Sequence, residues 1–300
     1  MTGRPDTRGD GDGWVECAQG HRHWGLYGAA GLLLRRTGDG DDQVLLQHRA
    51  TWSHHGGTWG LLGGARHRGE TAVDAALREA GEEGGLDGRL VRTHGRYDDA
   101  HGRWSYVTVL ARAEGDVDAR PTGGESIDVA WVPVGEVTGL PLHPGLAATW
   151  PWLHRALDPL TLVVDAANVV GSTPDGWWRD RAGAAHRLLA DLAGLVARGV
   201  PDAEMPDGLD RAPLRHWWPR VVVVLEGAAR PAADAAPGSL DVVAAAGSGD
   251  DAVVEALRDG PAGPVVVVTA DRALGERCRA EGGTVAGPRW LRGLLGAGAG

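Results

Sequence analysis

Three glutamates, Glu79, Glu82 and Glu83, follow Arg78 within one short stretch of the chain. Their i, i+3 and i+4 spacing would place the carboxylates on one face of a helix, where like charges repel. A divalent cation resolves that conflict, because hard Mg²⁺ or Mn²⁺ binds carboxylate and phosphate oxygens together. A solvated acidic face is the alternative that a bare pattern of this kind favours. The stretch is therefore a candidate metal site, with Arg78 placed to orient a carboxylate.

The flanking residues predict the helix that would position these glutamates. Thr71, with Asp74 after it, is typical of a capping box at a helix N-terminus. Apolar side chains then recur on one face, at Val73, Ala76, Leu77 and Ala80. Gly84 and Gly85 should end the helix, because glycine tolerates the left-handed conformation. We therefore expect a helix from about Thr71 to Glu83.

From Gly64 to Leu86 the sequence resembles the Nudix box, Gly-x5-Glu-x7-Arg-Glu-U-x-Glu-Glu-x-Gly-U, where U is an aliphatic residue. Every specified position is met; Leu62 departs only where proline commonly precedes the glycines. The resemblance implies an α+β fold, an α/β/α sandwich around a mixed sheet. It also implies a hydrolase that cleaves a nucleoside diphosphate linked to another group, with metal-activated water attacking phosphorus.

The resemblance further implies a role for each matching residue. Glu82 and Glu83 would bind Mg²⁺ or Mn²⁺, and Glu79 would be a ligand or the general base. The carbonyl of Gly64 would be another ligand. Arg78 would orient the glutamates and complete the catalytic set.

Residues outside the box are further candidates for this site. Glu125, ahead of Trp131, fits the later-loop carboxylate that the family often adds as a metal ligand. Trp59 and His55 border the glycine-rich stretch, and His143 follows the last expected strand of this half. These three could bind substrate by stacking on a base or touching phosphate. Ordinary loop and core roles are the alternative.

Bulk properties narrow the class of protein. At 300 residues the length suggests two domains, and 43% hydrophobic with 23% charged residues is typical of a soluble globular chain. A net charge of −10 disfavours non-specific duplex binding. The only cysteines, Cys17 and Cys278, are far apart, so we expect neither a disulfide nor a Cys-based zinc site. The sequence shows no signal peptide and no apolar run long enough to span a membrane, so the expected location is the cytoplasm.

The chain is expected to contain a flexible tail (1–13), a Nudix domain (14–156) and a second domain (157–300). His21 and His23 fall in a tail-like segment with no expected catalytic role. The Nudix half should have strands near 29–34, 44–46, 104–113 and 129–134, with a loop at 56–64. The second half should have strands at 160–170, 221–225, 240–246, 265–269 and 284–286, and helices at 181–198, 251–258 and 272–281. Short β-branched runs separated by helices predict a parallel sheet in a three-layer α/β domain.

Acidic residues follow several of these later strands. Ligands gather beyond the carboxyl ends of parallel strands, and the half resembles NYN/PIN-like nuclease domains, with "V-D-x-x-N", "D-D-x-U" and "T-x-D-R" patterns. The resemblance implies metal-dependent cleavage of single-stranded RNA, with Asp165, Asp251 and Asp271 as ligands. Candidates of lower rank are Asn168, Asp180, Glu226 and Asp250.

Two readings of the whole chain follow. In the first, a Nudix pyrophosphohydrolase is fused to a PIN-like RNase. In the second, the C-terminal half is a non-catalytic binding or dimerisation module. A silent Nudix fold used for sensing is disfavoured by the intact box. The nucleotide remains open, because free triphosphates, dinucleotides and capped RNA ends present the same diphosphate.

Overall fold

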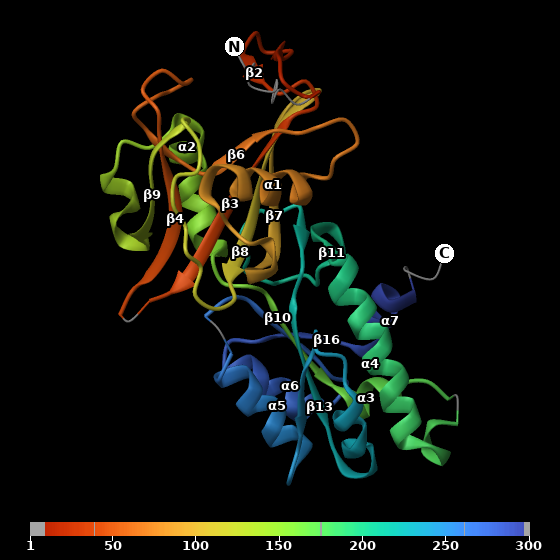
Figure 1. Ribbon diagram of the computed structural model, residues 1–300. Coiled ribbons are helices and arrows are strands. Elements are labelled where there is room, and N and C mark those ends of the chain that lie inside the picture. The colour runs from red at the N-terminus through yellow and green to blue at the C-terminus, as the bar shows by residue number, and fades with distance from the viewer. Residues whose placement is uncertain (1–9, 39, 175, 261, 297–300) are drawn as a thin grey trace. The chain divides into compact units, whose positions relative to one another are not determined.

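The computed structural model describes residues 10–38, 40–174, 176–260 and 262–296. The chain divides into two compact units, Met1–Leu157 and Asp158–Gly300, drawn in Figure 1. The expected tail of 1–13 lies partly outside the described residues. Its described end is ordered, because backbone N–H groups of Gly25 and Leu26 donate to the carbonyls of Gly13 and Gly11 at 2.8 Å. Gly11 and Gly13 are therefore hydrogen-bonded to the chain at Leu26 and Gly25.

The first unit is built on a mixed sheet. Within it the strands run in the order β7-β8-β3-β4-β5, with β6 paired to β3 and β9 to β4. The β3–β8 pair is parallel, while β3 pairs antiparallel with β4 and β6. The strands are β3 (Ala29–Thr37), β4 (Asp42–Arg49), β5 (Trp59–Gly60), β6 (Leu62–Ala65), β7 (Val91–His101), β8 (Trp104–Ala113) and β9 (Ser126–Pro133). The predicted mixed-sheet fold is thus confirmed for this half.

Some elements of the first unit differ from expectation. The glycine-rich loop of 56–64 contains β5 and part of β6, because its backbone pairs with β4 and β3. The expected tail-like segment is a hairpin of β1 (Trp14–Glu16) and β2 (Arg22–Trp24). Strand β7 was not expected, because its polar sequence lacks an apolar run.

One long helix covers the strands that precede it, as Figure 1 shows for α1 (Ala72–Gly84). Ala76 and Ala80 on its inner face are fully buried against a core that includes Leu32 and Leu62. Shorter helices follow: η1 (Gly88–Leu90), η2 (Val134–Gly139), α2 (Pro144–Leu153) and η3 (His154–Ala156). The buried alanine face lets α1 lie close to the sheet and fixes where its polar side points.

The second unit contains a parallel sheet, as predicted. Its strand order is β14-β13-β10-β15-β16, and every pairing in it is parallel. The strands are β10 (Thr161–Asp165), β13 (Arg220–Leu225), β14 (Asp241–Ala244), β15 (Val265–Val268) and β16 (Thr284–Ala286). The expected strand at 160–170 ends at Asp165, whose side chain caps a new helix, α3 (Ala166–Gly171). In the same unit β11 (Val200–Pro201) pairs antiparallel with β12 (His216–Trp217).

Helices cover both faces of this sheet. Residues of α5 (Gly249–Arg258) and α6 (Arg272–Ala280) share one core with Val163, Val222 and Val267 of the strands. Figure 1 shows α3 and α4 on the other side of the sheet. The remaining helices are α4 (Arg181–Arg198), α7 (Pro288–Gly296), η4 (Trp177–Arg179), η5 (Asp202–Glu204) and η6 (Gly227–Ala235).

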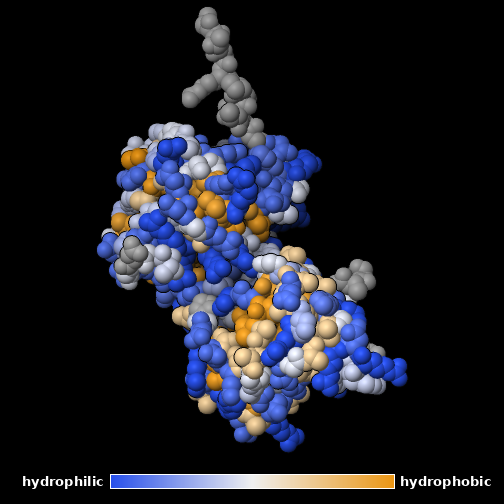
Figure 2. Space-filling view, turned by 60° about the horizontal axis from the view of Figure 1, so that its bottom comes forward, coloured by the Kyte–Doolittle hydropathy of each residue, from blue (hydrophilic) through white to orange (hydrophobic). Residues whose placement is uncertain are grey.

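Within the described residues, no helix is both long and apolar enough to cross a bilayer. On the face drawn in Figure 2, hydrophobic residues form patches separated by hydrophilic ones.

Candidate active site

The helix that bears the glutamates begins and ends as its local sequence predicts. Thr71 Oγ1 accepts a hydrogen bond from Asp74 N at 3.1 Å and donates one to Asp74 Oδ2 at 2.7 Å. Gly85 adopts a φ of 68°, and its N–H donates to the carbonyls of Ala80 and Gly81. Both ends are therefore fixed, so the glutamates of the last turns project from a defined backbone.

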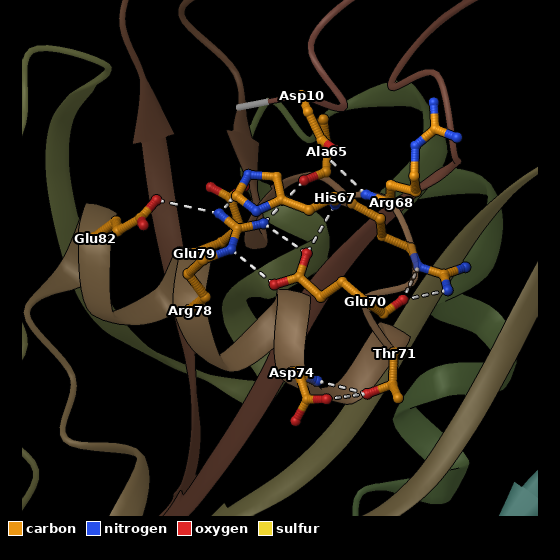
Figure 3. A network of polar contacts seen from close by, with 11 residues as sticks. Asp10, Ala65, His67, Arg68, Glu70, Thr71, Asp74, Arg78, Glu79 and Glu82 are labelled. Atoms are coloured by element: carbon orange, nitrogen blue, oxygen red, sulfur yellow. Dashed lines mark hydrogen bonds and ion pairs between the residues drawn. The ribbon is translucent and has the colours of Figure 1, made fainter. Parts of the chain in front are cut away.

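Arg78 ties this helix to the loop before it (Figure 3). Its Nε and Nη2 donate to the two carboxylate oxygens of Glu70 at 2.9 and 3.0 Å, and Nη2 also donates to Ala65 O at 2.9 Å. Nη1 contacts Glu79 Oε1 at 2.8 Å and Glu82 Oε2 at 3.2 Å. The hydrogen bonds to Glu70 raise the pKa of Arg78 and lower that of Glu70. Arg78 therefore holds Glu79 and Glu82 beside the loop that carries Glu70.

Glu83 is the most strongly perturbed carboxyl group of the site. Its Oε2 accepts a hydrogen bond from Gly63 N at 2.9 Å. Burial raises the pKa of Glu83 to about 7, and the nearby charges of Glu79 and Glu125 add to the shift. The Gly63 N–H and the side chain of Gln47 oppose it without cancelling it. The ionised Glu83 side chain is therefore not fully compensated by a positive charge or hydrogen bonds of the protein.

Glu79 lies against the glycine-rich turn. A Cβ on Gly64 would sit 2.6 Å from Glu79 Oε1, so the absence of a side chain makes room for this carboxylate. Burial raises the pKa of Glu79, and Arg78 only partly offsets it. By contrast the Glu82 side chain is 60% exposed. Glu82 therefore faces solvent, whereas Glu79 and Glu83 point into the site.

These residues fit a hard divalent cation. Glu79, Glu83 and Glu125 interact electrostatically, and the pKa shifts of the first two follow from burial among like charges. A positive charge among oxygen donors would remove that penalty, which is the situation Mg²⁺ and Mn²⁺ favour. The nearby guanidinium of Arg78 is already engaged with Glu70, Glu79 and Glu82.

The proposed substrate-binding side chains gather in one place. The rings of His55 and His143 lie 4.8 Å apart, and His143 N donates to Trp59 O at 2.7 Å. Burial, then the charge of Arg49, lowers the pKa of His143 to about 4, so the ring is neutral at neutral pH. One face of Trp59 is stacked on His48 at 4.8 Å. Any contact between Trp59 and a base would therefore use its other face or edge.

One polar residue of this site was missed from the sequence. Gln47 is fully buried, and its Nε2 donates to Ser126 Oγ at 2.8 Å while its Oε1 has no partner among the described residues. Gln47 is two residues after Leu45 on β4, so both side chains point to the same face of the sheet. Leu45 belongs to the core packed under α1, and Gln47 therefore faces that helix. The place of Gln47 directly after the apolar run Val44-Leu45-Leu46 was the available signal.

In the second unit, several expected acids do converge at the ends of the strands. Asp165 is buried and accepts hydrogen bonds from Asn168 Nδ2 at 2.7 Å and Thr269 Oγ1 at 2.9 Å. Burial raises the pKa of Asp250, and the charges of Asp271 and Asp165 raise it further, with a smaller effect from Glu226. These acids therefore form one electrostatic group.

Two of the expected acids point elsewhere. Asp251 Oδ1 pairs with Arg277 at 2.6 Å, and its side chain is 71% exposed. Asp180 caps α4 by accepting from Gly183 N at 2.8 Å. In the group around Asp165, Asp250 therefore occupies the place that the sequence suggested for Asp251.

Comparisons with known proteins bear on the first unit. The NUDIX domain family matches residues 26–155. A Mycobacterium tuberculosis protein called "Putative 8-oxo-dGTP diphosphatase 3" is 50% identical over 159 residues, which cover 50% of this chain and 72% of that protein. A Bifidobacterium longum "Nucleoside triphosphate pyrophosphatase/Nudix hydrolase fusion protein" is 40% identical over 155 residues, covering 50% of this chain and 32% of that one.

A solved structure is also similar. The crystal structure of a Nudix hydrolase from M. smegmatis is 45% identical, with a TM-score of 0.45, and the match covers 48% of this chain and 93% of that one. Together with the intact glutamate helix, the relatives settle the family of this chain. It belongs to the NUDIX family, and it is a hydrolase that acts on phosphoric anhydride bonds.

Proposed function

We propose that the first unit is a Mg²⁺- or Mn²⁺-dependent pyrophosphohydrolase of nucleoside triphosphates, with oxidised purine nucleotides such as 8-oxo-dGTP as the favoured class. The observation that carries the metal assignment is Glu83, a carboxyl group buried beside Glu79 and Glu125 with its pKa raised to about 7. The nucleotide class is supported by the similarity to the Mycobacterium tuberculosis protein named for this activity.

Different residues of the protein would orient the carboxylates and bind the cation. Gly63 N orients the Glu83 carboxylate, and Arg78 orients Glu79. A divalent cation held by Glu79, Glu83 and Glu125 would activate water and offset the charge on the diphosphate. Glu82, exposed at the rim, could complete the ligand set or hold a water molecule. The carbonyl of Gly64, beside Glu79, is a further oxygen ligand in this proposal.

A substrate comparison tests the nucleotide class. The purified protein is assayed with Mg²⁺ or Mn²⁺ on 8-oxo-dGTP, dGTP, ADP-ribose and 5′-capped RNA, and the products are separated by chromatography. We expect the highest kcat/KM on 8-oxo-dGTP, with release of the nucleoside monophosphate and pyrophosphate. A higher kcat/KM on ADP-ribose or capped RNA would refute the nucleotide class but leave the hydrolase assignment intact.

For the second unit we propose a metal-dependent RNase of the NYN/PIN-like type. The supporting observation is the group formed by Asp165, Asp250 and Asp271, in which burial and like charge raise the pKa of Asp250. The competing proposal, a binding or dimerisation module, predicts no turnover. Cleavage of single-stranded RNA by wild type, lost in Asp165→Asn but kept in the Nudix variant Glu83→Gln, would support the nuclease. No cleavage with Mg²⁺ or Mn²⁺ would favour the module.

We also propose that the two units are independent domains. Arg78, Glu83 and Glu125 all lie before Leu157, where the first unit ends. A chain truncated after Leu157 should remain folded and keep nucleotide hydrolysis, as measured by circular dichroism and turnover. A folded but inactive truncation would show that the second unit contributes to the site.

A further inference from the structure

Four side chains of the two types that commonly bind zinc, one cysteine and three histidines, come together on the first unit, away from the glutamate helix in sequence. Cys17, His21, His23 and His101 each offer a ligand atom, and these atoms all lie within 4.8 Å of one another. Three of them belong to the β1–β2 hairpin, and His101 ends strand β7. The sequence suggested no zinc site because the cysteines are far apart, but histidines here take the place of further cysteines.

Tight turns place these residues. Cys17 N donates to His21 O at 2.9 Å, and Gly20, with a φ of 80°, closes the turn between them. His21 directly precedes β2 and His23 lies within it, two residues further on. His101 stands at the tip of the β7–β8 hairpin, opposite Trp104.

The two hairpin tips are packed against each other. The His23 ring stacks on Trp104 at 4.0 Å between centroids, with 15° between the planes. It also lies 4.6 Å from the His101 ring. Trp104 Nε1 donates to Gly25 O at 3.0 Å. The cluster therefore bridges segments that are distant in the sequence.

One buried polar atom of the cluster, Nε2 of His23, lacks a hydrogen-bond partner among the described residues, and Cys17 forms no disulfide. Cys17 is only 8% exposed. The His101 ring nitrogens lie 3.3 Å from Gln19 Oε1 and 3.5 Å from Asp99 Oδ2. Ligating histidines commonly use one ring nitrogen for the metal and the other for such a carboxylate or amide oxygen.

We propose that Cys17, His21, His23 and His101 bind a structural Zn²⁺ ion. One thiolate and three imidazoles form the nitrogen and sulfur set that zinc binds tetrahedrally, whereas Mg²⁺ and Mn²⁺ prefer oxygen. Metal–ligand bonds of about 2.0–2.3 Å in a tetrahedron require ligand atoms roughly 3–4 Å apart; the four atoms here all lie within 4.8 Å of one another, so small side-chain movements would complete the tetrahedron. Four protein ligands leave no open position, so this ion would have no catalytic role.

The zinc ion would have a structural role and stabilise the β1–β2 hairpin. The hairpin strands β1 and β2 have three residues each. An isolated two-stranded hairpin of this kind is marginal in water. A zinc ion shared with His101 would fix the hairpin to the β7–β8 tip, because binding free energy becomes folding free energy when ligands come from separate segments.

Metal content of the full-length protein tests the proposal directly. Protein purified without added metal is desalted and analysed by mass spectrometry for zinc, iron, copper and manganese. We expect about one equivalent of zinc per chain, with at least tenfold less in Cys17→Ser and His101→Gln. Cys278→Ser is the matched control, since it removes the other cysteine and should leave zinc unchanged. Equal zinc in wild type and Cys17→Ser, or another metal in its place, would overturn the assignment.

A spectroscopic measurement remains decisive if the variants do not fold. Metal-free wild-type protein is titrated with Co²⁺ and its absorption spectrum recorded. We expect intense visible bands of tetrahedral Co²⁺ and a thiolate-to-cobalt charge-transfer band, saturating at one equivalent and reversed by Zn²⁺. Both should persist in Glu83→Gln, which separates this site from the glutamate site. Weak binding without the thiolate band would refute the proposal.

Discussion

Replacing Glu83 by glutamine should stabilise the metal-free protein at neutral and alkaline pH. The pKa of Glu83 is raised by burial from 4.5 to about 7, so the folded state binds this proton more tightly than the unfolded state. The stability contributed by the protonated form is complete below pH 4.5 and is lost as the pH rises through 7. Glutamine keeps an oxygen that can accept from Gly63 N, but it has no charge to lose.

The size of the effect follows from the shift. A change from 4.5 to about 7 corresponds to at most about 3.5 kcal/mol, at roughly 1.4 kcal/mol per pKa unit. For a unit of this size each kcal/mol moves Tm by about 2–4 °C. We therefore expect Glu83→Gln to raise Tm by up to about 14 °C above pH 7 and to have little effect near pH 4.

The assay is thermal unfolding of wild type and Glu83→Gln between pH 4 and 8, after identical removal of metal. Glu82→Gln is the matched control, because that side chain is 60% exposed and its pairing contributes little. Saturating Mg²⁺ should then stabilise wild type more than Glu83→Gln. A pH-independent difference, or a Glu83→Gln protein less stable than wild type above pH 7, would refute the reasoning about buried charge.

Other substitutions test the remaining contacts. Arg78→Lys should lower kcat about tenfold or more, because an ammonium cannot reproduce the forked contacts of the guanidinium; unchanged kcat would contradict its positioning role. Gly64→Ala should displace Glu79, since the new Cβ would lie 2.6 Å from Oε1, and we expect reduced metal affinity by calorimetry with an unchanged circular dichroism spectrum. In the second unit, Asp165→Asn should abolish RNA cleavage. Asp251→Asn should leave cleavage within about twofold of wild type, because the native carboxylate pairs with Arg277. Cleavage lost in Asp251→Asn but kept in Asp165→Asn would exclude the proposed group.

The sequence predicted the glutamate helix well because the signals that define it are local. Thr71 caps its start and Gly85 ends it with a positive φ, within the residues that the pattern covers. The environment of Glu83 was not predictable in the same way. Gly63 N and Gln47 reach it from β6 and β4, and only the folded sheet brings these strands beneath the helix.

Strand β7 shows why part of the fold was missed. Its sequence is largely polar, and its buried centre includes His94, whose Nε2 contacts Ala156 O at 2.9 Å. Burial lowers the pKa of His94 to about 4 and keeps it neutral, a state that the sequence does not reveal. The Asp250 and Asp251 pair illustrates a finer limit. Adjacent helical residues point about 100° apart, so the sequence could not decide which one joins Asp165.

In our proposal, carboxylates of the glutamate helix form a metal-dependent centre for anhydride cleavage. The most direct measurement is kcat of Glu83→Gln on a nucleoside triphosphate at saturating Mg²⁺, with Mn²⁺ binding followed by electron paramagnetic resonance. The control is Glu136→Gln, an exposed glutamate in η2. We predict that Glu83→Gln loses at least about 100-fold in kcat together with Mn²⁺ affinity, while Glu136→Gln matches wild type. Wild-type turnover by a folded Glu83→Gln protein would show that Glu83 does not hold a catalytic metal.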